Sequence, residues 1–319
     1  MKLTVLIAIL LCAGTASAQT APSPTFAERL GWPKGAKVVI FHIDDAGMSY
    51  SSNEGTIKAM TEGLATSCSI MMPCPWVSGF RAWLKEHPDA DAGLHFTLTS
   101  EWEHYRWGPV AGKAQVPGLA DKDGCLWDSV ALTIKNASAD EVEKEIRAQL
   151  DRAITMGIQP THLDSHMGTL FESTEYLGRY VKVGIEKQIP VLFPGGHMHY
   201  ISQGAPMPVD AAAAIGQTLW DGGLPVVDDI YADTYDWPRA EKTDRLIAVL
   251  KGMAPGILEV IVHCTDPTEE FAAISPSGDK RKGDLEAMLD PRLKKFLEDE
   301  GIIRTTWREM KTRRDALKK

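Results

Sequence analysis

Apolar runs of strand length alternate with segments of helical periodicity along most of the chain. This alternation is typical of a parallel sheet built from β-α units. No change of composition and no linker rich in proline and serine interrupts the units, so we expect one barrel-like α/β domain over residues 19–319. An open, doubly wound sheet is the alternative. The strands are expected at residues 37–43, 66–72, 91–95, 160–164, 189–193, 224–229, 256–262 and 302–306.

Two helix starts are marked by a serine followed three residues later by a glutamate. Ser51 with Glu54 precedes Ile57, and Ser138 with Glu141 precedes a longer apolar stripe. In such a capping box, each side chain satisfies a backbone N–H group at the start of the helix. We therefore expect helices to begin at both serines.

Two stretches do not follow the β-α rhythm. They run from Thr99 to Trp127, rich in Trp, Gly and Pro, and from Pro194 to Met207. Long loops in a compact domain are commonly lids or walls of a binding site. Both loops are therefore expected near the functional site.

The first residues have the pattern of a secretory signal. Lys2 is followed by an apolar run over residues 3–12 and then by small residues that end at Ala16-Ser17-Ala18. This order predicts that residues 1–18 are removed and that the mature protein is exported, to the periplasm or outside the cell. A bilayer requires about 20 apolar residues, so no transmembrane segment is expected.

Composition narrows the class of protein. Of 319 residues, 44% are hydrophobic and 24% are charged, as in an ordinary globular chain. The formal net charge is −9 and no dense Lys/Arg block precedes the C-terminal tail, so we expect no nucleic-acid partner. The cysteines after the signal do not form a disulfide framework, so we expect buried thiols with at most one bridge. These are Cys68, Cys74, Cys125 and Cys264.

Ionisable residues recur where four predicted strands end. In a parallel barrel these strand ends share one face, where catalytic groups gather. An Asp and two His residues there make a plausible three-ligand site for a divalent cation, with positions open to water and substrate. The residues are Asp44 and Asp45, His95, Asp164 and His166, and His263.

Each of these residues also has an ordinary structural explanation. An adjacent Asp pair is common in a turn at a strand end, and a lone His is more often a hydrogen-bonded core residue than a metal ligand. Their joint placement at the ends of separate strands is what favours a metal site.

Four motifs occur in a familiar order along the chain: Ile43-Asp-Asp-Ala-Gly-Met-Ser49, Gly93-Leu-His-Phe-Thr-Leu-Thr99, Thr161-His-Leu-Asp-Ser-His166 and Leu258-Glu-Val-Ile-Val-His263. On these motifs, the sequence between about Lys37 and Met310 resembles the YdjC/ChbG carbohydrate deacetylases. The resemblance implies a distorted TIM-like barrel that removes N-acetyl groups from amino sugars.

The resemblance also implies roles for individual residues. Asp45, His95 and His166 match the metal-ligand positions, and Asp44 would be the general base. A cation lowers the pKa of a bound water, whose proton Asp44 takes as hydroxide attacks the acetamide carbonyl. His263, at the end of a different strand, is the candidate acid for the leaving amine. Two histidines and a carboxylate suit Zn²⁺ by ligand type, and Mg²⁺ is the other expectation.

His162 and Asp164 lie in the same His-x-Asp-x-His run as His166. With the two-residue alternation of a strand, both would face the side that His166 uses. Asp164 would then accept the N–H of a ligand histidine and fix its tautomer. The alternative for His162 is that it only caps a strand.

The sequence departs from the family pattern near the substrate. Ala46 stands where Phe is usual, and Met167-Gly168-Thr169 replaces a His-rich continuation, so the sugar contacts are expected to differ. Loop side chains that could stack on or reach a sugar have loop packing as their alternative. They are Trp102, Tyr105, Trp107, Trp127, His197, His199 and Tyr200. For Asp228 and Asp229, at another strand end, we expect a structural role.

The sequence therefore predicts a metal-dependent hydrolase that deacetylates an N-acetylated carbohydrate. One alternative is a secreted sugar-binding protein without turnover, although binding alone does not need a general base beside a metal site. Another is a metal-dependent amidase or esterase on a non-carbohydrate acyl group, which would use the same residues. The sequence does not determine the sugar, its length or the oligomeric state.

Overall fold

The computed structural model describes residues 23–201 and 207–317. The described residues form a seven-stranded sheet in the order β4-β3-β2-β1-β6-β5, and β7 pairs with β1. All of these pairs are parallel. The strands are β1 (Lys37–Ala46), β2 (Ser67–Ile70), β3 (Ala92–Phe96), β4 (Leu163–Ser165), β5 (Asp229–Tyr231), β6 (Gly256–Val262) and β7 (Ile303–Arg304).

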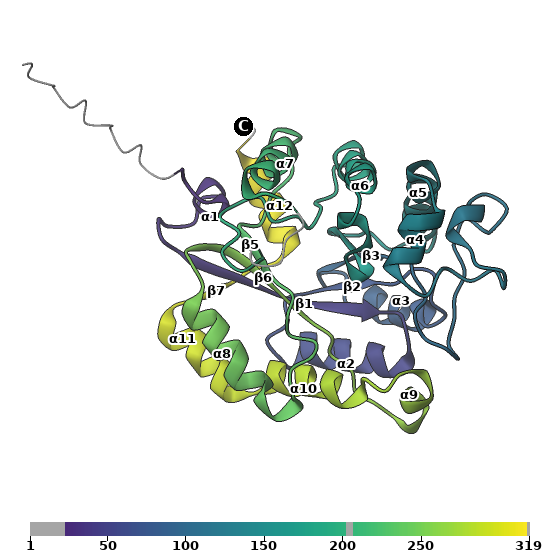
Figure 1. Cartoon of the computed structure of the whole chain (residues 1–319). Helices are drawn as coiled ribbons and strands as arrows, with labels where there is room; N and C mark the ends of the chain where they lie inside the picture. The colour runs from purple at the N-terminus through teal and green to yellow at the C-terminus, as the bar shows by residue number, and fades with distance from the viewer. Residues whose placement is uncertain (1–22, 202–206, 318–319) are drawn as a thin grey trace, which may run out of the picture.

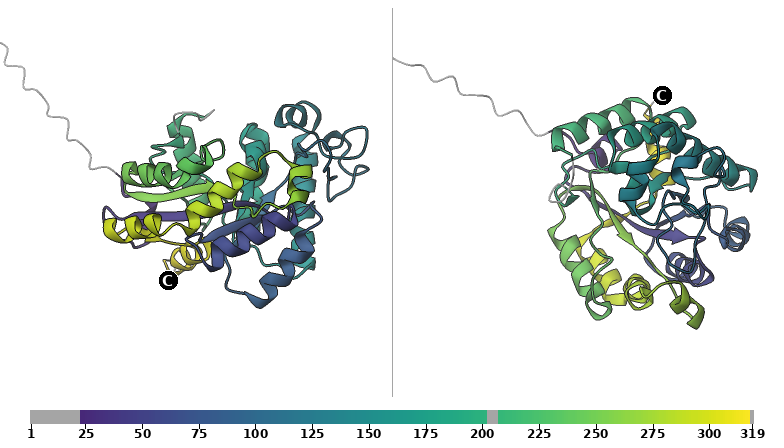
Figure 2. Two further views of the ribbon diagram at one scale, coloured as in Figure 1. Left: turned by 90° about the horizontal axis from the view of Figure 1, so that it is seen from below. Right: turned by 45° about the vertical axis from the view of Figure 1, so that its right-hand side comes forward.

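Helices surround the curled sheet on its outside. Figure 1 shows α5, α6 and α7 on one side and α2, α8, α10 and α11 on the other, and Figure 2 shows them around the strands. The helices are α1 (Phe26–Arg29), α2 (Tyr50–Thr61), α3 (Val77–Glu86), α4 (Val130–Asn136), α5 (Ala139–Thr155), α6 (Thr174–Lys187), α7 (Val209–Asp221), α8 (Lys242–Gly252), α9 (Glu269–Ile274), α10 (Gly278–Leu289), α11 (Pro291–Glu300) and α12 (Trp307–Ala316). Shorter 3₁₀ turns are η1 (Pro117–Leu119), η2 (His166–Phe171) and η4 (Arg239–Glu241).

The sheet curls towards a barrel between its two outer strands. A single bridge joins Leu163 of β4 to Val191, and another joins Pro194 to Val227, two residues before β5. We call residues 191–194, with the two bridges that hold them, the seam. The predicted TIM-like α/β barrel is therefore confirmed, in the distorted form that was expected.

The seam replaces the strand expected at 189–193, and the strand expected at 224–229 is reduced to the bridge at Val227 and the start of β5 at Asp229. Pro190 stands in the first of these ranges, Pro225 stands in the second, and Pro194 directly follows the first. A proline has no backbone N–H and cannot donate to a ladder, so pairing is limited to isolated bridges. The other six expected strands are present, with bounds shifted by up to three residues.

The two predicted helix starts have different outcomes. The capping box of Ser138 and Glu141 is present in full at the start of α5. The prediction for α2 is wrong, because the Ser49 side chain accepts from Ser52 N and α2 begins at Tyr50, ahead of Ser51.

The two long loops lie at the carboxyl end of the strands. The first, Thr99 to Trp127, contains the turn η1 and an antiparallel bridge between Ala120 and Leu126. Its chain is held by Glu145 of α5, which accepts from Val110 N and Ala111 N. The second is described as far as Ile201, and residues 202–206 lie outside the described residues.

Three other expectations concern the chain as a whole. The predicted signal, residues 1–18, lies outside the described residues. In residues 23–201 and 207–317 no helix has the length and apolar character needed to cross a membrane. All four cysteines of this part are free thiols, and three of them are buried, as expected.

Candidate active site

The carboxyl end of β1 carries two consecutive carboxylates, Asp44 and Asp45. Successive residues of a regular strand point to opposite faces, yet both of these side chains line the same cavity. An irregularity in the pairing of β1 with β2, between Ile43 and Ala46, inserts one extra residue in β1. Asp45 also adopts a φ of 69°, in the left-handed region. The bulge and this torsion bring both carboxylates to one face.

Asp45 meets two histidines from other strands. Its Oδ1 atom lies 3.4 Å from His95 Nε2 and 3.4 Å from His166 Nδ1. His95 comes from β3, and His166 follows β4 as the first residue of η2. The three predicted ligands are thus brought together, and all three are buried.

The outer nitrogen of each histidine faces another carboxylate. His95 Nδ1 lies 2.7 Å from Asp164 Oδ1, and His166 Nε2 lies 3.1 Å from Glu101 Oε2. Metal-binding histidines are commonly oriented in this way, because the second carboxylate fixes the tautomer that leaves the inner nitrogen free to bind. The inner nitrogens here are those that face Asp45.

The second oxygen of Asp45 is occupied by an arginine. Arg281 of α10 donates from Nη1 to Asp45 Oδ2 at 2.7 Å and from Nε to Ser277 Oγ at 2.9 Å. Asp45 Oδ1, by contrast, is buried and has no hydrogen-bond partner among the described residues. An unsatisfied buried carboxylate oxygen is costly, so its position between two imidazole nitrogens fits a divalent cation.

Asp44 and His263 stand beside this cluster. Asp44 Oδ2 lies 3.6 Å from His95 Nε2 and 3.7 Å from His263 Nε2. His263 directly follows β6, and its backbone N–H donates to Asp284 of α10 at 3.0 Å. Four strands therefore deliver the five residues expected to carry the chemistry. The ligand atoms of Asp44, His95 and Asp164 also lie close enough together to hold a metal ion.

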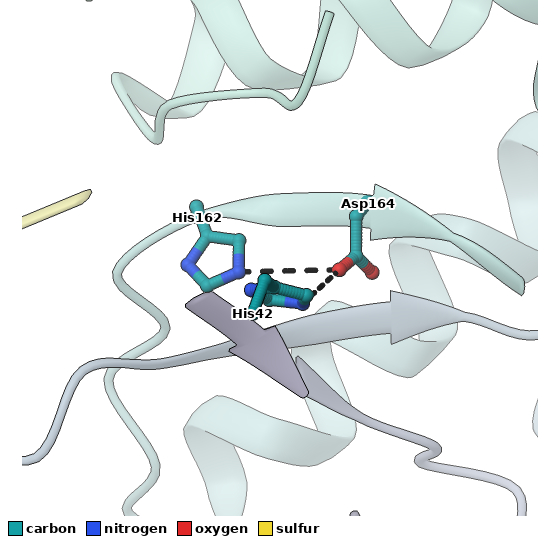
Figure 3. Close-up of side chains that lie close together, drawn as sticks. All are labelled: His42, His162 and Asp164. Atoms are coloured by element: carbon teal, nitrogen blue, oxygen red, sulfur yellow. Dashed lines mark ion pairs between the residues drawn. The ribbon is translucent and has the colours of Figure 1, made fainter. Parts of the chain in front are cut away.

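A buried polar layer lies beneath the cluster, inside the barrel. His42 of β1 sits with its Nε2 atom 2.8 Å from Asp164 Oδ2 and 3.3 Å from Asp44 Oδ1. Figure 3 shows His42 and His162 converging on Asp164, and the longer contact, from His162 Nε2, is 4.0 Å. Asp164 thus contacts His42 and His95 together and links the interior layer to the candidate metal ligands.

His162 and Glu259 complete this layer. His162 stacks on Trp307, and its Nδ1 atom is 3.0 Å from the Thr161 hydroxyl. Glu259, which is fully buried in β6, lies 3.4 Å from His42 Nδ1. Barrel interiors are usually filled by branched apolar side chains, whereas this interior is polar and contacts the site above it through Asp44 and Asp164.

The buried carboxylates and histidines of the cluster stabilise one another in their charged forms. Burial alone would lower the pKa of His166, but Glu101 and Asp45 raise it to about 10. Burial would raise the pKa of Asp45, but Arg281 and His166 bring it well below its usual range. A cation and a proton compete for the same nitrogen of His166, so metal binding here would release protons.

The interior residues and His263 respond differently to burial. Burial raises the pKa of Glu259 to about 8, with smaller contributions in the same direction from Asp164 and Asp44. Burial lowers the pKa of His263 to about 4, and Arg281 acts in the same direction. At neutral pH, Glu259 therefore keeps its proton and His263 is neutral.

A cavity of about 980 Å³ opens over the cluster. Its volume falls at the upper end of the range for ligand pockets. Asp44, Asp45, His95, His166 and His263 line one end, and most of the other lining residues are apolar.

A family model described as YdjC-like protein matches residues 38–299, most of the chain. The chain belongs to the YdjC-like family. The resemblance inferred from the four motifs is thereby confirmed.

Two relatives in this family carry enzyme names. A carbohydrate deacetylase of Thermus thermophilus is 29% identical over 284 residues, which cover 89% of this chain and 97% of the relative. A chitooligosaccharide deacetylase of Serratia marcescens is 32% identical over 133 residues, or 41% of this chain and 49% of that protein. An Enterococcus faecalis structure, described as a candidate cellobiose-phosphate cleavage protein, shares the fold with a TM-score of 0.73 at 21% identity, covering 85% of this chain and 98% of that one.

The aromatic and histidine contacts expected for a sugar lie mostly away from the cavity of this YdjC-like protein. Trp107 is buried and donates from Nε1 to Thr99 O, and it does not line the cavity. His197 Nδ1 lies 3.8 Å from Asp229 Oδ2, and His197 does not line the cavity either. Trp102 does line the cavity. The expected structural role of Asp228 agrees with its contacts, since its carboxylate accepts from backbone N–H groups of α1 and β6.

Four residues of the site were not found from the sequence. Glu101 lies in the first long loop, where no pattern distinguishes it from its neighbours. Arg281 is 236 residues from its partner Asp45. His42 and Glu259 carried a usable signal, because each is a charged or polar residue inside an otherwise apolar strand.

Proposed function

We propose that this YdjC-like protein is a metal-dependent hydrolase that removes the N-acetyl group from an amino sugar or oligosaccharide. The observation that carries the proposal is the convergence of Asp45 Oδ1, His95 Nε2 and His166 Nδ1, with Asp44 and His263 beside them. Relatives named carbohydrate deacetylases support the reaction and the class of substrate.

In this proposal Asp45, His95 and His166 hold one divalent cation, Zn²⁺ or Mg²⁺. When bound, such a cation lowers the pKa of a water molecule and polarises the amide carbonyl of the substrate. Arg281 keeps Asp45 Oδ2 engaged, so that Oδ1 is directed to the two histidines. Asp164 and Glu101 hold the outer nitrogens of those histidines.

Asp44 is the proton acceptor in this proposal. Its carboxylate lies 3.6 Å from the ligand nitrogen His95 Nε2 and lines the cavity, so it can take a proton from the attacking water. Breaking the amide C–N bond expels an amine, which must be protonated. His263 is the proposed donor, and because its pKa is about 4 it enters the reaction neutral. The proton that it gives must therefore arrive during turnover, and Asp44, 3.7 Å away, is the adjacent carrier.

We propose further that the mature protein acts outside the cytoplasm, in the periplasm or as a secreted enzyme. The support is the charged, apolar and small-residue order of residues 1–18. Fractionation of the host cells, with the mass of the isolated protein, tests this. A cytoplasmic protein that retains residues 1–18 would overturn it.

The test of the proposed activity is acetate release by the mature protein from N-acetylglucosamine and its oligomers. We expect release that a chelator abolishes and that one added divalent cation restores. The control is the same panel with O-acetylated and simple N-acetyl amides that contain no sugar. Release from those compounds alone would point to the amidase or esterase alternative, and saturable sugar binding without release would point to a binding protein.

A further inference from the structure

The cavity continues away from the metal cluster along a surface of buried apolar side chains. We define this apolar wall by six residues, each at most 7% exposed: Leu192, Phe193 and Met198, Ala212 of α7, Ile230 of β5 and Ile261 of β6. The wall therefore draws on the seam, the loop that follows it, one helix and two strands. These elements fix its position beside the cluster, because Ile261 is only two residues before His263.

The wall offers little to a chain of sugar hydroxyls. The charged lining residues of the cluster hold one another, as Asp45 does with Arg281 and His166 with Glu101. Glu172 and Lys280 also line the cavity, and Lys280 pairs with Asp236, which does not. None of the six wall residues carries a polar side-chain group. Of the loop aromatics expected to stack on a sugar, Trp107 is enclosed by its own loop and Trp102 lines the cavity. A free oligosaccharide lying along the wall would lose water from its hydroxyl groups without gaining partners.

An apolar group of the substrate would gain binding affinity from the same surface. Each methylene moved from water to such a surface contributes about fourfold in affinity. A cavity of about 980 Å³ has room for such a group in addition to one sugar at the cluster.

We propose that the substrate is amphipathic: an N-acylated amino sugar with its amide at the cluster and an apolar group of several carbons along the apolar wall. This inference rests on the proposed deacetylase function and narrows its substrate class. The apolar group is either a long N-acyl chain or an apolar aglycone. In both cases one water adds across the amide C–N bond, and a carboxylic acid and an amine are released.

Two series of compounds show whether the apolar group is the N-acyl chain or the aglycone. One series has N-acyl glucosamines with acyl chains of two to ten carbons, and the other has alkyl N-acetylglucosaminides with alkyl chains of one to ten carbons. We expect kcat/KM to rise at least tenfold along one series relative to free N-acetylglucosamine. A kcat/KM that stays equal to that of free N-acetylglucosamine along both series would overturn this inference, and acetate release from the free sugar would leave the proposed function intact.

A blocking variant locates the effect. Ala212→Phe places a large ring in the wall, and Ala213→Phe places the same ring on the exposed side of the same helix. We expect the rise of kcat/KM with chain length to be at least tenfold smaller in the Ala212 variant and to persist in the Ala213 variant. An unchanged gain in both variants contradicts the wall as the binding surface. Circular dichroism and thermal unfolding establish that each variant is folded.

Direct binding separates the two proposals if no compound is hydrolysed. Octyl N-acetylglucosaminide and N-octanoylglucosamine are titrated into the metal-free protein by calorimetry. Saturable binding of either, with affinity at least tenfold above that of N-acetylglucosamine, supports the amphipathic ligand even though the deacetylase function has failed. Equal or absent binding overturns the inference. Ile230→Asn serves as a second wall variant if Ala212→Phe does not fold.

Discussion

Asp45 combines a strained backbone with a chemical role. A φ of 69° is uncommon for a residue with a Cβ atom, and Asp and Asn tolerate it better than other such residues. Strain of this kind persists where the surroundings hold it, and here Arg281 and the bulge of β1 do so. Amide replacement therefore keeps the backbone while removing the charge, which makes Asn the suitable substitution at Asp45.

We expect Asp45→Asn and Asp44→Asn to fail in different ways. Asp45→Asn removes a charged ligand oxygen, so both bound metal and activity should be lost. Asp44→Asn should keep the metal and lose activity by about 10²–10⁴-fold, the usual contribution of a general base. Metal content by mass spectrometry of metals and acetate release measure the two effects. Equal metal loss in the two variants would contradict the division of roles.

The sequence identifies those site residues that follow a strand. Asp44, Asp45, His95 and His263 could be placed in this way, since parallel strands end at one face. Glu101 and Arg281 could not, because a loop residue and a helix residue reach the site only through tertiary packing. The apolar wall of the cavity could not be predicted either, because its side chains are of the same types as those of any buried segment.

At the scale of single elements, α2 packs unusually closely against the segment that follows β6. A Cβ atom added at Gly55 would lie 2.4 Å from Thr265 Cα and 2.6 Å from Cys264 O. Both are backbone atoms, so they cannot rotate away as a side chain would. Glycine at this position holds the helix against the residues next to His263.

We expect Gly55→Ala to lower the free energy of unfolding by about 1–3 kcal/mol, the usual cost of overpacking. Gly178→Ala in α6 is the matched control, because a Cβ there would have no neighbour within 4 Å. Alanine has the higher helix propensity, so this control should gain about 0.5–1 kcal/mol. Urea denaturation measures both. A neutral or stabilising Gly55→Ala would show that the contact is loose.

The pair α5 and α6 is joined by a cluster of charges around Glu143. Lys182 contacts its Oε1 atom at 2.8 Å, and Arg147 and Arg179 each contact the carboxylate at 2.7 Å. Hydrogen bonding from Lys182, and then from the two arginines, lowers the pKa of Glu143 to about 2. A lowered carboxyl pKa stabilises the fold fully above the unfolded value of about 4.5, and this stabilisation is lost as the pH falls towards 2.

Glu143→Gln should therefore reduce stability above about pH 5, by on the order of 1 kcal/mol because the cluster is near the surface. The difference from the unsubstituted protein should shrink between pH 4.5 and 2. Glu54→Gln, at an exposed position of α2, is the control. Urea unfolding at a series of pH values measures the effect. A difference that does not change over this pH interval would exclude the charge of Glu143 as its cause.

Local signals place the elements but not their ends. The capping box at Ser138 is correct because both of its partners lie within one turn. At α2, Ser51 has the same spacing to a glutamate, but Ser49 is the residue that caps the helix. The bulge of β1 ends at Ala46, and the helix starts four residues later, at Tyr50. Prolines reduce the expected strands around the seam to single bridges.

At the scale of the whole molecule, the barrel brings together ligands that are far apart in the sequence. Asp45, His95 and His166 come from the ends of β1, β3 and β4. The unfolded chain lacks this arrangement, so a cation that binds the folded state stabilises it by mass action.

We expect saturating Zn²⁺ or Mg²⁺ to raise the melting temperature by several degrees, and a chelator to reverse the rise. At a free cation concentration of 100 times Kd, the stabilisation is about 2.7 kcal/mol. Asp45→Asn, which keeps the fold but replaces the carboxylate ligand by a neutral amide, should show no such rise. Differential scanning calorimetry measures it. An equal rise in both proteins would indicate that the cation binds elsewhere.

The overall architecture followed from the sequence because every β-α unit repeats the same pattern. The contact of Asp164 with a ligand histidine was also expected, but the pairing of Asp164 with His42, and of His42 with Glu259, was not. Side-chain direction within a short strand depends on register, and register is set by neighbours that the sequence does not identify.

The seam has a consequence for how the sheet opens. Along β1 and β6, seven consecutive residue pairs share a ladder, whereas the seam is held by two isolated bridges. Local opening is easiest where few backbone hydrogen bonds must break together. Amide hydrogens of Leu192 and Gly195 should therefore exchange with deuterium faster than those of β6. The barrel is then closed around its whole circumference, and the seam is where it opens most easily.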